Sequence, residues 1–152
     1  MSVTACVVQA RLGSSRLPAK VLLPLPNGKT VLEEVLFRCE TIPGVDVVVA
    51  AIPDTAENDI LATFVSEMNE PVYPFPPRPT ASPRFTLVRG PEHDVLARYA
   101  KAAEAVNADV VMRITSDCPL LDPDACGFVL KMRRETGAGF VSNSWPVREC
   151  PH

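Results

Sequence analysis

Short apolar runs, rich in valine, alanine and isoleucine, recur along this chain, and segments with the apolar spacing of helices separate them. The runs extend from Thr4 to Ala10, from Val45 to Ile52 and from Asp109 to Thr115. Strands without polar alternation are buried on both faces, which is typical of parallel sheets covered by crossover helices. The pattern therefore predicts a three-layer α/β domain whose strands are joined by helices.

Four segments between and after these runs predict helices. A capping box of Thr30 and Glu33 precedes the first, and Asp122 and Pro123 are expected at the N-cap and first position of the fourth. Pro91 is expected in the first turn of the third. The apolar faces of the first three are Val31, Leu32, Val35, Leu36 and Cys39; Ile60, Leu61, Phe64, Val65 and Met68; and Val95, Leu96, Tyr99, Ala102, Ala103 and Val106.

A proline-rich stretch interrupts this rhythm. Six prolines lie between Pro71 and Pro83, so this stretch cannot be an interior strand or helix. We expect a surface insertion over residues 71–84, the alternative being a ligand for an aromatic-lined groove of a partner. Residues Phe85 to Val88 are expected to resume the sheet, and residues 138–143 to add a further strand.

Length and charge limit what the chain can do. Its 152 residues suit one domain over 1–152, and 15 Lys and Arg against 18 Asp and Glu give a net charge of −3. No overall positive field draws it to nucleic acid or to an anionic membrane. We find no secretory leader and no apolar run of membrane-spanning length, so we predict a cytoplasmic protein.

The five cysteines are odd in number and form no Cys-x-x-Cys pair. Most lie in apolar surroundings, which predicts reduced core thiols, with a metal or redox site as the alternative.

The loop after the first run concentrates positive charge around small residues. A loop that leaves a parallel strand at its carboxyl end exposes backbone N–H groups, and Gly13, Ser14 and Ser15 let a phosphate approach them. Arg11, Arg16 and Lys20 add the cations. The alternative is a solvated basic loop.

A second polar group follows the run from Asp109 to Thr115. Extended geometry places Arg113, Thr115 and Asp117 on one face, with Asp117 just beyond the strand. A carboxylate that faces a phosphate cradle suits a magnesium ion. Asp117 could instead be a turn residue before Pro119.

Two other nucleotide-binding motifs are absent. Residues 27–30, Asn-Gly-Lys-Thr, lack the upstream glycine of a P-loop because Leu23 occupies that position. No G-x-G-x-x-G follows the first run, and two histidines give little support to a histidine-based zinc site or hydrolase triad.

Three motifs in order resemble the cytidylyltransferase family of CMP-Kdo and CMP-sialic acid synthetases, most closely its spore-coat-polysaccharide branch. They are QARLGSSRLPAKVLLPL, HDVLARY and RITSDCPLLDP. The resemblance implies a Rossmann-like nucleotidyltransferase fold that binds CTP over the first loop, with Mg²⁺ bridging its phosphates.

The resemblance also implies roles for single residues. Arg11 and Lys20 would act in catalysis, and Asp117 would bind the metal. The nucleotide would contact Arg11, Gly13, Ser14, Ser15, Arg16, Lys20, Ala50, Ala51, Asp94, Arg98 and Thr115. For Asp94 and Arg98, a role on the helix surface is the alternative.

The implied reaction transfers CMP from CTP to an acidic sugar or similar acceptor and releases pyrophosphate, in surface polysaccharide or glycoconjugate synthesis. A nucleotide-binding module without turnover and a glycosyltransferase are the alternatives. Family members continue beyond a segment like residues 140–152 into a Gly-x-Asp-x-Glu stretch, so we expect a C-terminally truncated fold with little activity alone. A homodimer is possible.

Overall fold

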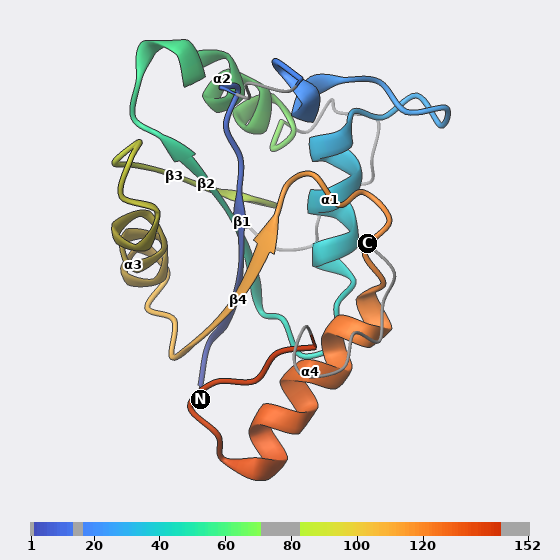
Figure 1. Cartoon of the computed structure of the whole chain (residues 1–152), viewed down its shortest axis with the longest axis vertical. Helices are drawn as coiled ribbons and strands as arrows, with labels where there is room; N and C mark the ends of the chain where they lie inside the picture. The colour runs from blue at the N-terminus through green and yellow to red at the C-terminus, as the bar shows by residue number, and fades with distance from the viewer. Residues whose placement is uncertain (1, 14–16, 71–82, 144–152) are drawn as a thin grey trace.

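The computed structural model describes residues 2–13, 17–70 and 83–143. Four strands and four α-helices alternate along these residues (Figure 1). Two short 3-10 helices, η1 (Lys20–Leu22) and η2 (Ala56–Asn58), lie in the loops after the first two strands. The strands are β1 (Thr4–Gln9), β2 (Val47–Pro53), β3 (Thr86–Gly90) and β4 (Val110–Thr115). The α-helices are α1 (Val31–Glu40), α2 (Asp59–Glu67), α3 (Val95–Ala105) and α4 (Pro123–Thr136).

All four strands are parallel, in the order β3-β2-β1-β4. The central strand β1 pairs on both sides: Val7 lies opposite Val49 of β2 and Arg113 of β4. After β1 the chain builds β2 and β3 to one side, and it then returns to place β4 on the other side of β1. The strand order therefore reverses between β1 and β4, and the carboxyl ends of these strands are where α/β sheets of this kind bind ligands.

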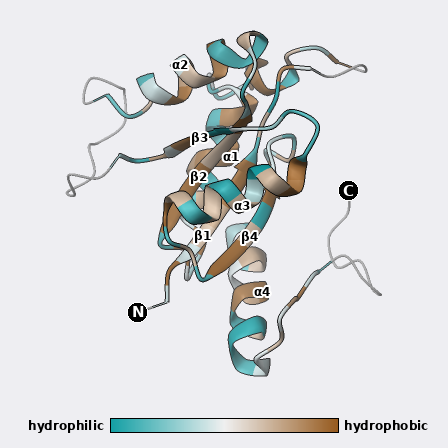
Figure 2. Cartoon of the chain, turned by 90° about the vertical axis from the view of Figure 1, so that its left-hand side faces the viewer, coloured by the Kyte–Doolittle hydropathy of each residue, from teal (hydrophilic) through white to brown (hydrophobic). Residues whose placement is uncertain are grey.

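Helices cover both faces of the sheet, which confirms the predicted three layers. One buried cluster joins alternate residues of the strands to α1, α2 and α4, and the other joins the remaining alternate residues to α3. Figure 2 shows α3 in front of the sheet and α1 behind it. Right-handed crossovers explain this division, because reversing the direction of travel across the sheet moves the connecting helix to the opposite face.

The first helix begins as its sequence predicts. Glu33 N donates to Thr30 Oγ1 at 3.2 Å, and Thr30 N donates to Glu33 Oε2 at 2.5 Å, which completes the capping box. Leu32, Val35 and Leu36 are fully buried against the sheet. Asp122 likewise caps α4, with Pro123 as its first residue.

Several sequence-based expectations are wrong in detail. Ile60 and Leu96 are 56% and 79% exposed, because each lies near the start of its helix on the side away from the sheet. Pro91 precedes α3, which Asp94 caps. Residues 138–143 form no strand, because they pair with none of the four strands of the described part, although they line a hollow together with β4.

Four cysteines lie in the described part, and none of them is in a disulfide there, which agrees with the prediction of reduced thiols. Cys6 and Cys39 are buried, Cys126 is half-buried and Cys118 is exposed, so the expectation of core thiols is wrong for Cys118. A hydrogen bond with Cys39 and burial raise the pKa of the Cys6 thiol, which keeps it protonated.

Two further observations concern the limits of the described part. None of its helices is long and apolar enough to span a bilayer. Nearly all of the proline-rich insertion, residues 71–82, lies outside it, as does Cys150.

Candidate nucleotide-binding site

The loop after β1 is anchored at both ends. Leu12 N donates to the side-chain Oδ1 of Asn58 at 2.9 Å, and Ala19 N donates to Leu12 O at 3.1 Å. Asn58 is 1% exposed and comes from η2, in the loop after β2. Two neighbouring loops at the carboxyl edge of the sheet are thereby joined, which holds the base of the predicted phosphate cradle in place.

Of the small residues of the predicted cradle, Gly13 lies in the described part of the chain. Ser14, Ser15 and Arg16 lie outside the described residues. Gly13 lies beside Glu57 of η2, because a Cβ on Gly13 would be 3.9 Å from both carboxylate oxygens. Glu57 is thus an acidic group at this loop that sequence reasoning missed.

The loops after β1 and β4 meet through an ion pair. Lys20 Nζ lies 2.6 Å from Asp117 Oδ2, although the two residues are 97 positions apart. Their side chains are 30% and 43% exposed. The Lys20 hydrogen bond lowers the pKa of Asp117 against the opposing effect of burial, and the Thr115 hydroxyl lowers it further. Asp117 is therefore a charged carboxylate at the point where the strand order reverses.

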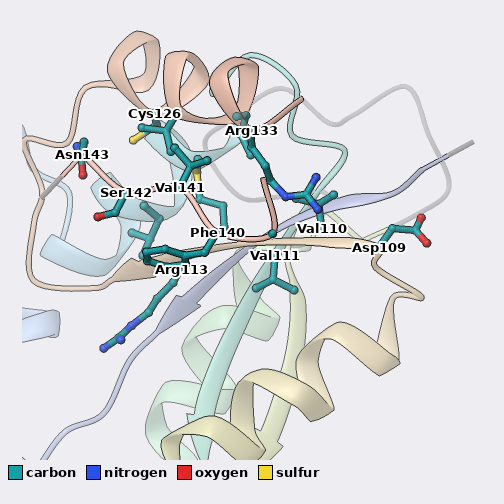
Figure 3. Close-up of a pocket in the computed structure, with 15 residues that line it drawn as sticks. Asp109, Val110, Val111, Arg113, Cys126, Arg133, Phe140, Val141, Ser142 and Asn143 are labelled. Atoms are coloured by element: carbon teal, nitrogen blue, oxygen red, sulfur yellow. The ribbon is translucent and has the colours of Figure 1, made fainter. Parts of the chain in front are cut away.

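Arg113 lies on the α3 side of β4. Its guanidinium is 5.7 Å from the centre of the Tyr99 ring, and Tyr99 belongs to α3. In Figure 3, Arg113 and Val111 point to the side of β4 away from α4. Arg113 therefore adds positive charge near the carboxyl half of β4, while Tyr99 restrains its direction.

Arg98 is buried, so the helix-surface alternative is wrong for this residue. It is 1% exposed, and its Nη1 donates to the carbonyl oxygens of Pro91 at 2.6 Å and Glu92 at 3.0 Å. Nε and Nη2 are buried and have no hydrogen-bond partner among the described residues. Burial lowers the pKa of Arg98, and the like charge of Arg11 adds to this effect.

Asp94 lies at the start of α3, and Ala50 and Ala51 lie in β2. Asp94 Oδ1 accepts a hydrogen bond from Ala97 N at 2.8 Å, which makes Asp94 the N-cap of α3. Ala50 and Ala51 are fully buried inside the sheet in β2. Contacts between the nucleotide and these three residues stay predictions.

Arg89, at the end of β3, was also missed by sequence reasoning. Its Nε lies 3.2 Å from Asp54 Oδ1, and its Nη1 lies 2.7 Å from Asp59 Oδ1. Its Nη2 donates a hydrogen bond to Thr55 O at 3.0 Å. These contacts fix the loop after β2, which carries Asn58 and Glu57. No local motif indicates such a role, because all three partners lie in another segment of the chain, residues 54–59.

A hollow lies away from the ion pair of Lys20 and Asp117. It measures about 630 Å³ and is lined by β4, one side of α4 and residues 139–143 (Figure 3). Neither Lys20 nor Asp117 lines it. The hollow therefore lies apart from the ion pair that joins the loops after β1 and β4.

The donor set suits a metal bound together with a nucleotide. No three His, Cys, Asp or Glu side chains gather into a metal-ligand group within residues 2–13, 17–70 and 83–143. Asp117 offers carboxylate oxygens, and Mg²⁺ commonly takes one or two carboxylates while phosphates and water complete its shell. Asp117 therefore fits a magnesium site that it would share with the phosphates of a nucleotide.

A parallel sheet with cations and a carboxylate at its reversal point defines an α/β nucleotide-binding domain. A cytidylyltransferase from Leptospira borgpetersenii serovar Hardjo-bovis has the same fold, with a TM-score of 0.70 and 26% identity. The match covers 87% of this chain and 49% of that one. The nucleotidyltransferase fold is thereby confirmed.

The family follows from the sequence comparisons. The cytidylyltransferase family model matches residues 5–69. The spore coat polysaccharide biosynthesis protein SpsF of Bacillus subtilis is 30% identical over 139 residues, which are 89% of this chain and 51% of that protein. The chain belongs to the cytidylyltransferase family.

A second relative comes from the other branch of the predicted family. The 3-deoxy-manno-octulosonate cytidylyltransferase of Syntrophotalea carbinolica is 28% identical over 123 residues, which are 81% of this chain and 42% of that protein. The chain spans about half the length of the curated relatives it matches.

Proposed function

We propose that this chain binds CTP with Mg²⁺ and serves the transfer of CMP to an acidic sugar, with release of pyrophosphate. The observation that carries the proposal is the joining of the loops after β1 and β4 by Lys20 and Asp117 at the reversal point of the sheet. Family membership names the nucleotide, and the sugar acid in the name of one relative suggests the acceptor class.

The reaction places specific demands on the site. An acceptor oxygen attacks the α-phosphorus, the bond to the β-phosphate oxygen breaks, pyrophosphate leaves, and the acceptor proton passes to solvent. Alignment and neutralisation of negative charge are what a protein must supply for such a displacement. Lys20 and Arg11 bring positive charge to this edge, and Arg16 and the Gly13 to Ser15 amides are expected to complete the cradle.

Magnesium, when bound, would neutralise phosphate charge, and Asp117 would hold it. Thr115 supports that role because its hydroxyl favours the charged form of Asp117. Asn58 and Arg89 do not need to touch the ligand, since they fix the loops that do.

Thermal unfolding with CTP or ATP, each with Mg²⁺, tests the nucleotide. We expect CTP to raise the melting temperature more than ATP at equal concentration, because a ligand that binds only the folded state stabilises it. Equal shifts, or no shift with CTP, would contradict the proposal. Product analysis with CTP and a panel of acidic sugars then tests the acceptor.

A nucleotide-binding role without turnover is the second candidate. The observation that favours it is that no three acidic, cysteine or histidine side chains gather anywhere in the described part. CTP binding without pyrophosphate release, in the presence of a competent acceptor, would support this candidate. A cytoplasmic location also stays a proposal, and the four free thiols of the described part suit a reducing compartment.

A further inference from the structure

Lys20 and Asp117 neutralise each other in the ligand-free protein. The ammonium lies 2.6 Å from one carboxylate oxygen, within the range of a charge-assisted hydrogen bond. Yet the proposed function gives each group a different partner: phosphate for Lys20 and a divalent cation for Asp117. Neither group can fully engage its own partner while the pair stays closed.

We propose that Lys20 holds the cation position beside Asp117 until nucleotide phosphate draws it away, so that metal and nucleotide bind to this site cooperatively. This inference rests on the proposed function. It adds an exchange of partners in which Lys20 passes from carboxylate to phosphate and Asp117 passes from ammonium to metal.

Electrostatics gives the direction of the coupling. A divalent cation at Asp117 Oδ2 and an ammonium at the same oxygen repel each other over a few ångströms, so each opposes the other. A nucleotide triphosphate carries more negative charge than one carboxylate and offers Lys20 a stronger partner. Coupling of this kind is reciprocal: if the nucleotide strengthens metal binding, the metal strengthens nucleotide binding by the same factor.

The geometry allows the exchange. Lys20 is the first residue of η1, and its side chain is 30% exposed, so the ammonium can move without opening the core. The Asp117 side chain is 43% exposed, so water can reach its carboxylate when Lys20 moves away. The described part of the chain offers no three-residue metal-ligand group, so a metal at Asp117 would bind weakly alone and gain further oxygen ligands from the nucleotide.

Mn²⁺ binding, followed by electron paramagnetic resonance without nucleotide, tests the exchange. We expect Lys20→Met to bind Mn²⁺ about threefold to fivefold more tightly than the unchanged protein, the scale of an exposed ion pair. Lys20→Met/Asp117→Asn should lose this gain. Lys20→Gln serves as a second variant if the methionine variant proves poorly folded.

Lys29→Met is the matched control. Lys29 Nζ lies 3.3 Å from Glu34 Oε2. The Lys29 side chain is 29% exposed, almost the same fraction as the 30% of Lys20. Its substitution should leave Mn²⁺ affinity unchanged. If Lys20→Met and Lys20→Gln also leave it unchanged, or if Lys29→Met raises it equally, the exchange is wrong.

A second titration measures the coupling itself. With CTP present, Mn²⁺ affinity should rise several-fold in the unchanged protein and rise less in Lys20→Met. An equal rise in both would overturn the coupling. Failure of CTP to bind at all would overturn the proposed function instead, and the nucleotide-free titration would still decide whether Lys20 competes with the metal.

Discussion

Asn58 shows how one buried polar side chain can position a site that it does not enter. Its Oδ1 accepts from Leu12 N at 2.9 Å, and its Nδ2 donates to Thr55 Oγ1 at 2.8 Å. Both polar ends of the side chain are therefore satisfied in a place without solvent. Loss of the side chain would leave the Leu12 amide without its acceptor.

We expect Asn58→Leu to lower the free energy of unfolding by about 1–3 kcal/mol, because a buried donor left without an acceptor loses its hydration. Urea denaturation measures this change, and hydrogen exchange at the Leu12 amide should accelerate. The exposed Asn143 serves as a control, and Asn143→Leu should change neither value. A stable Asn58→Leu protein with a protected Leu12 amide would contradict this account.

At the residue scale, the sequence predicts the charged residues of the site better than it predicts the side chains that hold the surrounding loops in place. The meeting of Lys20 and Asp117 follows from two polar loops at one edge of a parallel sheet. The burial of Arg98 does not, because it depends on Gly90: a Cβ there would lie 3.0 Å from Arg98 Cγ. Asn58 and Arg89 were missed for the same reason, since their partners lie on separate segments.

The segment that leads into α1 is held by Glu34, whose side chain is 10% exposed. Glu34 accepts from Arg38 Nε at 2.7 Å, Asn27 Nδ2 at 3.0 Å and Lys29 Nζ at 3.3 Å. Arg38 in particular lowers the pKa of Glu34 below its ordinary value of 4.5, although burial acts in the opposite direction. One carboxylate thus ties the turn around Asn27 to the helix.

The lowered pKa of Glu34 determines how the stability of the fold changes with pH. Glu34 stabilises the fold above pH 4.5, and this contribution is lost as the pH falls through its folded-state pKa. We expect Glu34→Gln to be less stable at pH 7 by about 1–3 kcal/mol, with the difference shrinking below pH 4. Urea denaturation across pH 3–7 measures it. A constant difference across this range would rule out ionisation as the cause.

The fourth helix contacts the turn before β2 through Gly127. A Cβ on Gly127 would lie 2.9 Å from Pro43 Cδ, closer than side chains tolerate. Alanine favours a helix over glycine by about 1 kcal/mol, but overpacking against a rigid ring costs about 1–3 kcal/mol. We expect Gly127→Ala to lower the melting temperature, while Gly139→Ala, with no atom within 4 Å of its Cβ, should not. A more stable Gly127→Ala protein would show that α4 can shift away from Pro43.

Element boundaries followed the sequence wherever a cap defined them. Thr30 and Asp122 are predicted and observed N-caps, whereas the N-cap of α3 is Asp94, so that α3 begins at Val95 and leaves Pro91 outside its first turn. The apolar residues Ile60 and Leu96 were assigned to buried faces by spacing alone. Spacing alone did not show which of two adjacent apolar residues faces the sheet: Leu61 is buried beside the exposed Ile60, and Val95 packs on the core beside the exposed Leu96.

On the scale of the whole molecule, the sheet has two unpaired edges. Within the described ranges nothing pairs with the outer side of β3 or of β4, and Val111, the second residue of β4, is 42% exposed. The order of strands was not predictable from apolar runs, because every run looks equally buried. The three layers were predictable, because runs of this kind require helices on both faces.

The central position of β1 also affects how the chain can fold. Its neighbour β4 comes from far along the chain, and Val3 N donates to Asp109 Oδ2 across 106 positions. Closing so long a loop before its contacts form costs chain entropy, so folds with distant pairings fold slowly. We expect refolding from urea over milliseconds to seconds, and Val111→Gly should slow it less than Val49→Gly if β1 and β2 pair first. Because β1 precedes the other three described strands along the chain, it would leave a ribosome before them and would remain unpaired on one side until β4 is made.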